Sequence, residues 1–384
     1  MPRVKILIAY ENGAGGHRAA ALAVKEALDD FGDLDSLALE LDQLAPRYRK
    51  QMYTTFMDIR PFFGPIVRFA FGFGMRPSLP LKLYAGFGAI TQPWGLRKFL
   101  DVVDKEAPDL ILSTHFRVNL VCNQWLERGQ LRTPVHSLVP DFVAHGIYPQ
   151  PRIQRYYVAS EAVRDDLMRS HIDPARIVVT GIPVSKKLCA SVGTREQIRL
   201  RLGLAPDLPV LLIMGGTRGD GDYGSLLREL EARRPRAQVV VLCGKNERLK
   251  VRLRRFSPGS SEKPVRLEGY QTNMSEWYGA ADLLLTKPGG MTISEALNLG
   301  KATLLHSPQP GKEEVQAERI AAAGWVRLER SPRNVVEAAI RILGDPTEIR
   351  RMEAAAQSYG QPDAAGRIAK KVATAARELR SRRP

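Results

Sequence analysis

Residues 4–17 read Val-Lys-Ile-Leu-Ile-Ala-Tyr-Glu-Asn-Gly-Ala-Gly-Gly-His, and residues 210–219 read Val-Leu-Leu-Ile-Met-Gly-Gly-Thr-Arg-Gly. Each stretch is a short apolar run that passes into glycines and then into a helical pattern. A glycine loop of this kind lets a ligand approach the backbone and the N-terminus of the following helix. Because this beginning occurs twice, we expect two Rossmann-like domains.

The rest of the chain alternates short β-branched runs with helical patterns, which is typical of α/β folds with parallel sheets. We expect an N-terminal domain over residues 1–183 and a C-terminal domain over residues 184–384. The expected strands of the first are Val4–Tyr10, Ser36–Leu41, Leu110–Ser113, Val135–Val139, Tyr156–Ala159 and Ile177–Thr180, with helices such as His17–Leu28 and Ser160–Ser170 between them. Those of the second are Val210–Met214, Gln238–Leu242, Val265–Leu267, Asp282–Thr286, Ala302–Leu305 and Trp325–Arg327.

Neither glycine loop carries the fingerprint of nicotinamide-cofactor binding. Aligning G-x-G-x-x-G on Gly13 and Gly15 places Arg18 at the third glycine, and no Walker A sequence is present.

The 384 residues carry a net charge of +16, which predicts attraction to polyanions such as nucleic acid, anionic membranes or phosphorylated substrates. Three cysteines in no zinc-like or redox spacing indicate a reducing, cytoplasmic environment. We identify no targeting segment and no stretch long and apolar enough to span a bilayer.

An irregular insertion, residues 47–98, does not fit a βα unit. It holds nine Lys or Arg residues against the single acid Asp58, together with eleven aromatic residues. Rings interleaved with cations suit a surface that dips into lipid headgroups, whereas the alternative is a partly buried lid. The residues expected to contact an anionic membrane are Phe62, Phe63, Arg68, Phe69, Phe71, Arg76 and Lys82. A basic C-terminal helix, residues 367–383, is either a second membrane contact or a solvated helix face.

The stretch Thr286-Lys-Pro-Gly-Gly-Met-Thr-Ile-Ser-Glu295 follows an expected strand and opens an expected helix. Its glycines would let backbone N–H groups face a diphosphate, and Glu295 would reach the two ribose hydroxyls of a nucleotide. The alternative is a glycine turn in which Thr292 and Glu295 form a capping box. One βα unit later, a polar loop carries Glu313, Glu314 and Gln316, which could bind sugar hydroxyls. Both loops follow strands of one parallel sheet, so we expect a nucleotide-sugar site at its carboxyl edge.

Seven short motifs occur in the order found in one known family. The chain resembles the diacylglycerol glycosyltransferases of glycosyltransferase family 28, of the monogalactosyldiacylglycerol synthase and processive diacylglycerol β-glucosyltransferase type, over about residues 4–343. The motifs are Gly15-Gly-His17, Pro140-Asp-Phe-Val-Ala-His145, Tyr156-Tyr-Val-Ala-Ser160, Val179-Thr-Gly-Ile-Pro183, Leu242-Cys-Gly-Lys-Asn246, Thr286-Lys-Pro-Gly-Gly290 and Pro310-Gly-Lys-Glu-Glu314.

The resemblance implies a GT-B fold, whose two Rossmann-like domains face each other across a cleft, and an inverting, metal-independent hexosyltransferase. It implies a peripheral enzyme on the inner face of the cell membrane that moves glucose or galactose from UDP-glucose or UDP-galactose to diacylglycerol, with no cofactor and no nucleic-acid partner. The donor residues that it implies are Gly216, Thr217, Gly269, Tyr270, Gly289, Gly290, Met291, Thr292, Glu295, Glu313, Glu314 and Gln316.

Three residues are candidates for the catalytic base or for acceptor positioning. His17 is expected to face the cleft, where a neutral imidazole could take the proton of the acceptor hydroxyl. Asp141 and His145 follow an expected strand and are the alternatives. His17 could instead cap its helix or bind an acceptor oxygen without proton transfer.

Two Asp-x-Asp sequences, Asp33-Leu-Asp35 and Asp220-Gly-Asp222, resemble the diphosphate-metal motif of other transferases. We expect helix-dipole charge compensation instead of a metal.

The chain departs from the family pattern at Pro140, Lys312 and Gln316, so the donor stays open between a hexose, an N-acetylhexosamine and a uronic acid. Another lipid acceptor, a UDP-sugar epimerase on the same fold and a nucleic-acid binder are the alternative functions.

Overall fold

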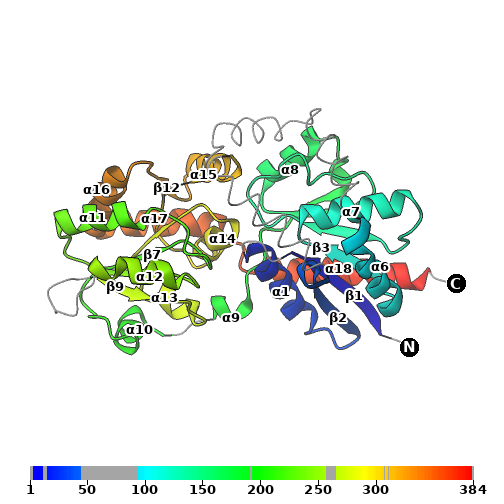
Figure 1. Cartoon of the computed structure of the whole chain (residues 1–384), viewed down its shortest axis with the longest axis horizontal. Helices are drawn as coiled ribbons and strands as arrows, with labels where there is room; N and C mark the ends of the chain where they lie inside the picture. The colour runs from blue at the N-terminus through cyan, green and yellow to red at the C-terminus, as the bar shows by residue number, and fades with distance from the viewer. Residues whose placement is uncertain are drawn as a thin grey trace. The chain divides into compact units, whose positions relative to one another are not determined.

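The computed structural model describes residues 3–11, 15–44, 93–190, 193–256, 265–306, 308–309 and 311–382 (Figure 1). The chain forms two compact units. The first comprises Met1–Ser185, Pro310–Lys312 and Asp363–Pro384, and the second comprises Lys186–Gln309 and Glu313–Pro362. Each unit holds a six-stranded parallel sheet, which confirms the expected α/β class with two Rossmann-like sheets.

The sheet of the first unit has the strand order β2-β1-β3-β4-β5-β6. The chain first builds outward from β1 to β2 and then returns to the other side of β1, so the winding reverses between β1 and β3. In open parallel sheets, ligands bind beyond the carboxyl ends of the strands at such a reversal. The strands are β1 (Val4–Tyr10), β2 (Leu34–Glu40), β3 (Leu110–Ser113), β4 (Val135–Leu138), β5 (Arg155–Val158) and β6 (Ile177–Val179).

The first helix of this unit, α1 (Gly16–Leu28), begins one residue earlier than expected. Gly15 adopts a left-handed conformation at its N-cap, with φ of 85°, which a residue with a side chain adopts only with strain. The other helices are α2 (Leu41–Leu44), α6 (Pro93–Glu106), α7 (Phe116–Glu127), α8 (Glu161–Arg169), the 3₁₀ turn η1 (Pro174–Arg176) and α18 (Ala364–Ser381).

The sheet of the second unit has the order β12-β11-β10-β7-β8-β9, with its winding reversed between β7 and β10. Alternate side chains of β7 enter two different cores: Leu211 and Ile213 pack with one set of helices, and Leu212 and Met214 pack with the other. Helices therefore cover both faces, as the continuous apolar runs of the strands predict. The strands are β7 (Val210–Met214), β8 (Gln238–Leu242), β9 (Val265–Glu268), β10 (Leu283–Thr286), β11 (Thr303–Leu305) and β12 (Arg327–Leu328).

The helices of the second unit alternate with these strands. They are α9 (Lys186–Cys189), α10 (Arg195–Arg201), α11 (Tyr223–Arg233), α12 (Glu247–Leu253) with the 3₁₀ turn η2 (Arg254–Phe256), α13 (Met274–Ala280), α14 (Gly290–Asn298), α15 (Lys312–Ala322), α16 (Pro332–Leu343) and α17 (Pro346–Tyr359). All twelve expected strands are present, and their ends lie within two residues of those observed.

The C-terminal helix α18 belongs to the first unit, whereas the sequence-based division assigned it to the second domain. Its apolar face, which includes Ile368 and Val372, is fully buried against α1 and β1. Its cations also pair within this unit: Arg377 binds Asp33 at 2.7 Å, and Arg380 binds the fully buried carboxylate of Asp109 at 2.8 Å. These two cations of the basic stretch are therefore structural.

The expected membrane-contact residues between 62 and 82 lie outside the described residues. Within the described part of the chain, no helix combines the length and the hydrophobicity needed to cross a bilayer.

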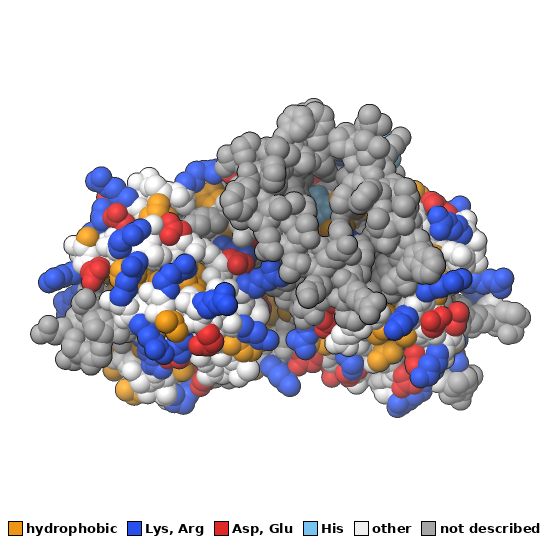
Figure 2. Space-filling view, in the orientation of Figure 1, with side chains coloured by type: hydrophobic (Ala, Val, Ile, Leu, Met, Phe, Trp, Pro, Cys, Tyr) orange, Lys and Arg blue, Asp and Glu red, His pale blue; other side chains and the backbone are white. Residues whose placement is uncertain are grey.

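Basic side chains are spread over the visible face of the second unit, with acidic ones between them (Figure 2). Some form exposed pairs, such as Arg333 and Arg233 with Glu337 at 2.9 and 3.1 Å. Exposed pairs of this kind contribute about 0–1 kcal/mol each, so they add little to the stability of the fold.

Candidate functional site

The second unit has its winding reversal between β7 and β10, and two of the expected donor loops follow these strands. The loop after β7 carries Gly216 and Thr217, and Gly216 has a left-handed φ of 71°. The loop after β10 leads directly into α14. The structure therefore brings both loops to the carboxyl edge of one sheet, as the sequence predicts.

The N-terminus of α14 is open. Gly289 is its N-cap in an extended conformation and has no side chain to cap the helix. Because α14 begins at Gly290, Thr292 lies inside the helix and not at its N-cap, so the alternative capping box between Thr292 and Glu295 is wrong. The N–H groups of Gly290, Met291 and Thr292 lie in the first turn, where a helix offers them no carbonyl of its own, and together with the helix dipole they suit an anion such as a diphosphate.

Glu295 lies in the second turn of α14, where its carboxylate meets a buried tyrosine. The Tyr278 hydroxyl donates to Glu295 Oε2 at 2.7 Å. Burial raises the pKa of Glu295 to about 7, while the bond from Tyr278 opposes this rise. A nucleotide hydroxyl that donates to this carboxylate would replace water that burial has removed.

Lys287, which sequence reasoning did not select, links three loops of this unit. Its Nζ donates to Asp220 Oδ2 at 3.0 Å and to Glu313 Oε1 at 3.4 Å. Glu313 also accepts a hydrogen bond from the Gln309 backbone N–H at 3.1 Å. The signal was present in the sequence, because Lys287 directly follows β10 and precedes the glycine pair.

Gln316, in α15, is fully buried, and its Nε2 donates to the Pro288 carbonyl at 2.6 Å. At least one of its amide hydrogens therefore holds the loop after β10. Its neighbour Glu314 is only partly buried in the first turn of the same helix.

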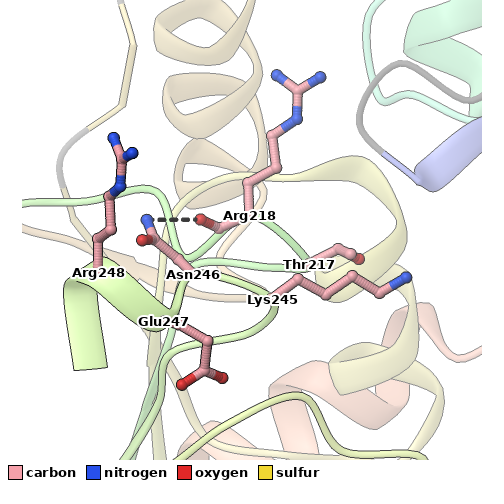
Figure 3. Close-up of a pocket in the computed structure, with 6 residues that line it drawn as sticks. All are labelled: Thr217, Arg218, Lys245, Asn246, Glu247 and Arg248. Atoms are coloured by element: carbon pink, nitrogen blue, oxygen red, sulfur yellow. Dashed lines mark hydrogen bonds between the residues drawn. The ribbon is translucent and has the colours of Figure 1, made fainter. Parts of the chain in front are cut away.

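A hollow of about 460 Å³ lies at the ends of β7 and β8 (Figure 3). Asn246 Nδ2 donates to the Arg218 carbonyl at 3.2 Å and joins the two loops. Lys245 Nζ lies 4.8 Å from the ring centroid of Tyr270, an expected donor residue that follows Gly269 after β9. The residues that line the hollow are Thr217, Arg218, Lys245, Asn246, Glu247 and Arg248.

In the first unit, His17 stands beside the reversal between β1 and β3. Its Nδ1 lies 2.5 Å from the carbonyl oxygen of Thr114, the residue that follows β3. Because a carbonyl only accepts, Nδ1 must carry the hydrogen, which leaves the lone pair of Nε2 free to accept a proton. Because the N-cap of α1 is Gly15, His17 lies inside the helix and its Nδ1 is used by Thr114, so the alternative of a helix-capping histidine is wrong.

Desolvation lowers the pKa of His17 to about 4, and the charge of Asp141 opposes this effect. The imidazole is therefore neutral at pH 7 and able to accept a proton, but its pKa lies well below the operating pH, near which a general base is most effective. Burial opposes the ionisation of Asp141, but the positive charge nearby, chiefly the Lys312 ammonium and its hydrogen bond, outweighs this desolvation and holds the pKa of Asp141 below the ordinary value.

Asp141 and His145 both lie in the loop after β4, close to Tyr148. Asp141 Oδ1 accepts from Lys312 at 2.9 Å, within the first unit, and Oδ2 accepts from the Tyr148 hydroxyl at 3.5 Å. The His145 ring lies 4.7 Å from that of Tyr148, and its buried Nδ1 has no hydrogen-bond partner within the described residues. Desolvation lowers the pKa of His145 to about 3, so its ring is also neutral.

His115 joins this group, although sequence reasoning did not select it. Its ring packs edge-on against His17, with centroids 4.4 Å apart, and contacts Phe116 at the same distance. Beneath it, Arg117 pairs with Glu11 at 3.0 Å, and both side chains are buried. The sequence marks Glu11 and His115 only by their position, because they follow β1 and β3. No alternation or spacing of residues distinguishes them from other residues at strand ends.

Both Asp-x-Asp sequences are accounted for by other contacts. Asp220 binds Lys287, and Asp222 Oδ1 accepts from the Ser225 N–H to cap α11. Asp33 pairs with Arg377, and Asp35 pairs with Arg3 at 3.0 Å. Across the described residues, no three His, Cys, Asp or Glu side chains gather as metal ligands would.

Comparison with known families matches both units. The model of the monogalactosyldiacylglycerol (MGDG) synthase family matches residues 17–184, and the model of the glycosyltransferase family 28 C-terminal domain matches residues 210–366. A processive diacylglycerol β-glucosyltransferase of Staphylococcus saprophyticus is 32% identical over 67% of this chain and 65% of its own length, slightly under two thirds of that relative. The protein of the same name from Staphylococcus aureus is 28% identical over 89% of this chain and 84% of its own length.

Solved structures show the same fold. MurG of Acinetobacter baumannii superposes with a TM-score of 0.61 at 15% identity, covering 96% of this chain and 99% of that one. UDP-GlcNAc 2-epimerase from Neisseria meningitidis, bound to UDP-GlcNAc, superposes with a TM-score of 0.64 at 17% identity, covering 97% of this chain and 100% of that one. These neighbours confirm the GT-B fold class.

Proposed function

Because this chain belongs to glycosyltransferase family 28, with an MGDG synthase domain before the family's C-terminal domain, we propose that it transfers a hexose from a UDP-sugar to diacylglycerol. The observation that carries the proposal is the open N-terminus of α14, with the Glu295 carboxylate one turn behind it. This pair of features fits the diphosphate and the ribose of one nucleotide.

In the proposed reaction, the second unit holds the donor. The N–H groups at the start of α14 bind the diphosphate and stabilise the charge that develops as UDP leaves. Gly216 and Thr217 close the opposite side of the phosphates, and Gly269 and Tyr270 contact the uracil. Glu313 and Glu314 bind the sugar, with Lys287 holding the Glu313 carboxylate in place, and the buried Gln316 supports the sugar site by holding the loop after β10.

The first unit supplies the base. The acceptor hydroxyl oxygen attacks the anomeric carbon, the bond from that carbon to the UDP oxygen breaks, and the hydroxyl proton passes to His17 Nε2. The Asp141 carboxylate, whose charge raises the pKa of His17, stabilises the imidazolium that forms. Attack opposite to the leaving group inverts the anomeric centre. General-base catalysis of this kind contributes about 10²–10⁴-fold.

Purified protein incubated with diacylglycerol in anionic vesicles and a panel of UDP-sugars is expected to form a glycosyl-diacylglycerol, detected by mass spectrometry. We expect UDP-glucose to be the donor, since the relatives in Staphylococcus are named glucosyltransferases. The yield should be unchanged by EDTA, because the N-terminus of α14 compensates the diphosphate charge.

The other outcomes discriminate among the alternatives. A product only from UDP-galactose, an N-acetylhexosamine donor or a uronic-acid donor would keep the reaction and change the sugar. An altered UDP-sugar without any lipid product would replace the proposal by an epimerase. Loss of product with EDTA, restored by Mg²⁺ or Mn²⁺, would contradict metal independence.

We propose further that the protein is peripheral on the inner face of the cell membrane and that residues 47–98 bind anionic lipid. The triple change Arg68→Glu, Arg76→Glu and Lys82→Glu is expected to weaken the affinity for anionic vesicles, measured by co-sedimentation, by at least about 10²-fold, because each cation near such a surface contributes about 1 kcal/mol and the new carboxylates are repelled. Binding to neutral vesicles is the control, and the triple change to glutamine, which removes the charges without reversing them, should weaken the affinity less. Undiminished sedimentation of the glutamate variant would make this segment a lid rather than an anchor.

A further inference from the structure

The contact between Tyr278 and Glu295 is built into the core of the second unit. Tyr278 lies on α13 and is fully buried among Trp277, Leu284 and Ala296. Its hydroxyl donates to Glu295 Oε2 at 2.7 Å, a normal distance for a hydroxyl that donates to a carboxylate. Since the tyrosine ring is enclosed by the core, its hydroxyl is a fixed point to which the carboxylate is tied.

The contact with Tyr278 uses one carboxylate oxygen of Glu295 and leaves the other oxygen available to accept hydrogen bonds from a ligand. Within the described residues, the Tyr278 hydroxyl is the group that bonds to the Glu295 side chain, and it uses Oε2. An untethered glutamate rotates broadly about its last side-chain torsion, so anchoring one oxygen also fixes the direction of the other. Oε1 and the remaining lone pair of Oε2 then form a preorganised double acceptor.

We propose that Tyr278 is a positioning residue that holds Glu295 to accept both ribose hydroxyls of the donor, and that this pair makes the site selective for ribonucleotide over 2′-deoxyribonucleotide diphosphates. The inference rests on the proposed function, because it takes UDP as the ligand. A 2′-deoxy donor leaves a desolvated carboxylate oxygen without a donor, and sites built to bond a hydroxyl reject such analogues strongly.

The charge state of Glu295 provides an independent readout. Burial raises the pKa of this carboxyl to about 7, and the hydrogen bond from Tyr278 lowers it. Cys189 on α9 also interacts with Glu295, although desolvation is the main cause that raises the pKa of its thiol. Removing the Tyr278 hydroxyl must raise the pKa of Glu295 further. In the native protein, the preference for UDP over 2′-deoxy-UDP should then increase as the pH rises through about 7. In a variant without the Tyr278 hydroxyl, the same increase should occur at a higher pH.

The test is calorimetric binding of UDP and 2′-deoxy-UDP between pH 6 and pH 9 to the native protein and to Tyr278→Phe. The native protein is expected to bind UDP at least tenfold more tightly than 2′-deoxy-UDP at pH 8. Tyr278→Phe should lose about tenfold in affinity for UDP and clearly less for 2′-deoxy-UDP, which keeps only the contact of its 3′-hydroxyl with Glu295. Both ligands carry the same phosphates, so the effect of phosphate protonation cancels in the ratio of the two affinities.

Two further variants separate positioning from packing. Tyr156→Phe removes a buried tyrosine hydrogen bond to the Gln150 carbonyl in the first unit and should leave both affinities unchanged. Glu295→Gln combined with Tyr278→Phe should bind no worse than Glu295→Gln alone. Equal losses for UDP and 2′-deoxy-UDP, or an unshifted pH dependence, would overturn the inference. Absence of UDP binding by the native protein would instead reject the proposed function.

Discussion

Glu295→Ala is expected to abolish UDP binding, measured by calorimetry, while the protein stays folded. Two hydrogen bonds from ribose hydroxyls to a carboxylate are worth about 1.5–3 kcal/mol each, so their loss weakens binding by at least about 10²-fold. The same loss should appear in kcat/KM for glycosyl transfer, because the ribose contact is made in both the ground state and the transition state.

The alanine variant also leaves the buried Tyr278 hydroxyl without its acceptor, which costs about 1–3 kcal/mol of stability. Glu295→Gln retains an acceptor for that hydroxyl and is the matched variant. Its melting temperature should equal that of the native protein, and it should still bind UDP poorly. Native affinity for UDP in either folded variant would reject the assignment of the ribose site.

His17→Gln is expected to lower kcat by about 10²–10⁴-fold with little change in KM for the UDP-sugar. The glutamine amide retains a donor for the Thr114 carbonyl, so the contact at the end of β3 survives while the proton acceptor is lost. UDP binding should be unchanged, because every expected donor contact lies in the second unit.

The pH dependence of kcat/KM checks the same assignment. A lowered pKa keeps His17 neutral down to about pH 4, so its protonation should not reduce activity near the ordinary histidine pKa of 6.5. Glu295, with a pKa of about 7, should instead produce a loss of activity as pH falls below neutrality. Asp141→Asn is the comparison: a larger loss of kcat there than in His17→Gln would make Asp141 the base.

The fold was largely predictable because its signal is local. Apolar runs such as residues 210–214 alternate with helical patterns and glycine loops, and only a doubly wound parallel sheet buries both faces of such strands. The placement of α18 was not predictable in this way. Its alanine-rich face could pack against many surfaces. Its contacts in the first unit include the pairs of Arg377 with Asp33 and of Arg380 with Asp109, which lie 344 and 271 residues earlier in the chain.

Some residues of the candidate site were also predictable from local sequence, and others were not. Gly289, Gly290 and Glu295 could be selected from the amino-acid sequence because glycines before a helix and a carboxylate one turn later form a local pattern for a nucleotide. Tyr278 could not, since a tyrosine in an apolar helix has no distinguishing pattern. Lys287 and His115 carry only the positional signal of a strand end, which many residues share. Their partners come from other elements of the sheet, as with Tyr278 and Glu295 on either side of β10.

The residue order alone thus specifies two parallel α/β sheets, the loops that follow their strands, and the chemical groups available there, because these depend on neighbours within one βα unit. The strand order that brings β7 beside β10 and β1 beside β3 is decided by tertiary structure. So are the anchoring of Glu295 by Tyr278 and the lowered pKa of His17, because burial and the meeting of distant side chains arise only when the sheets are assembled.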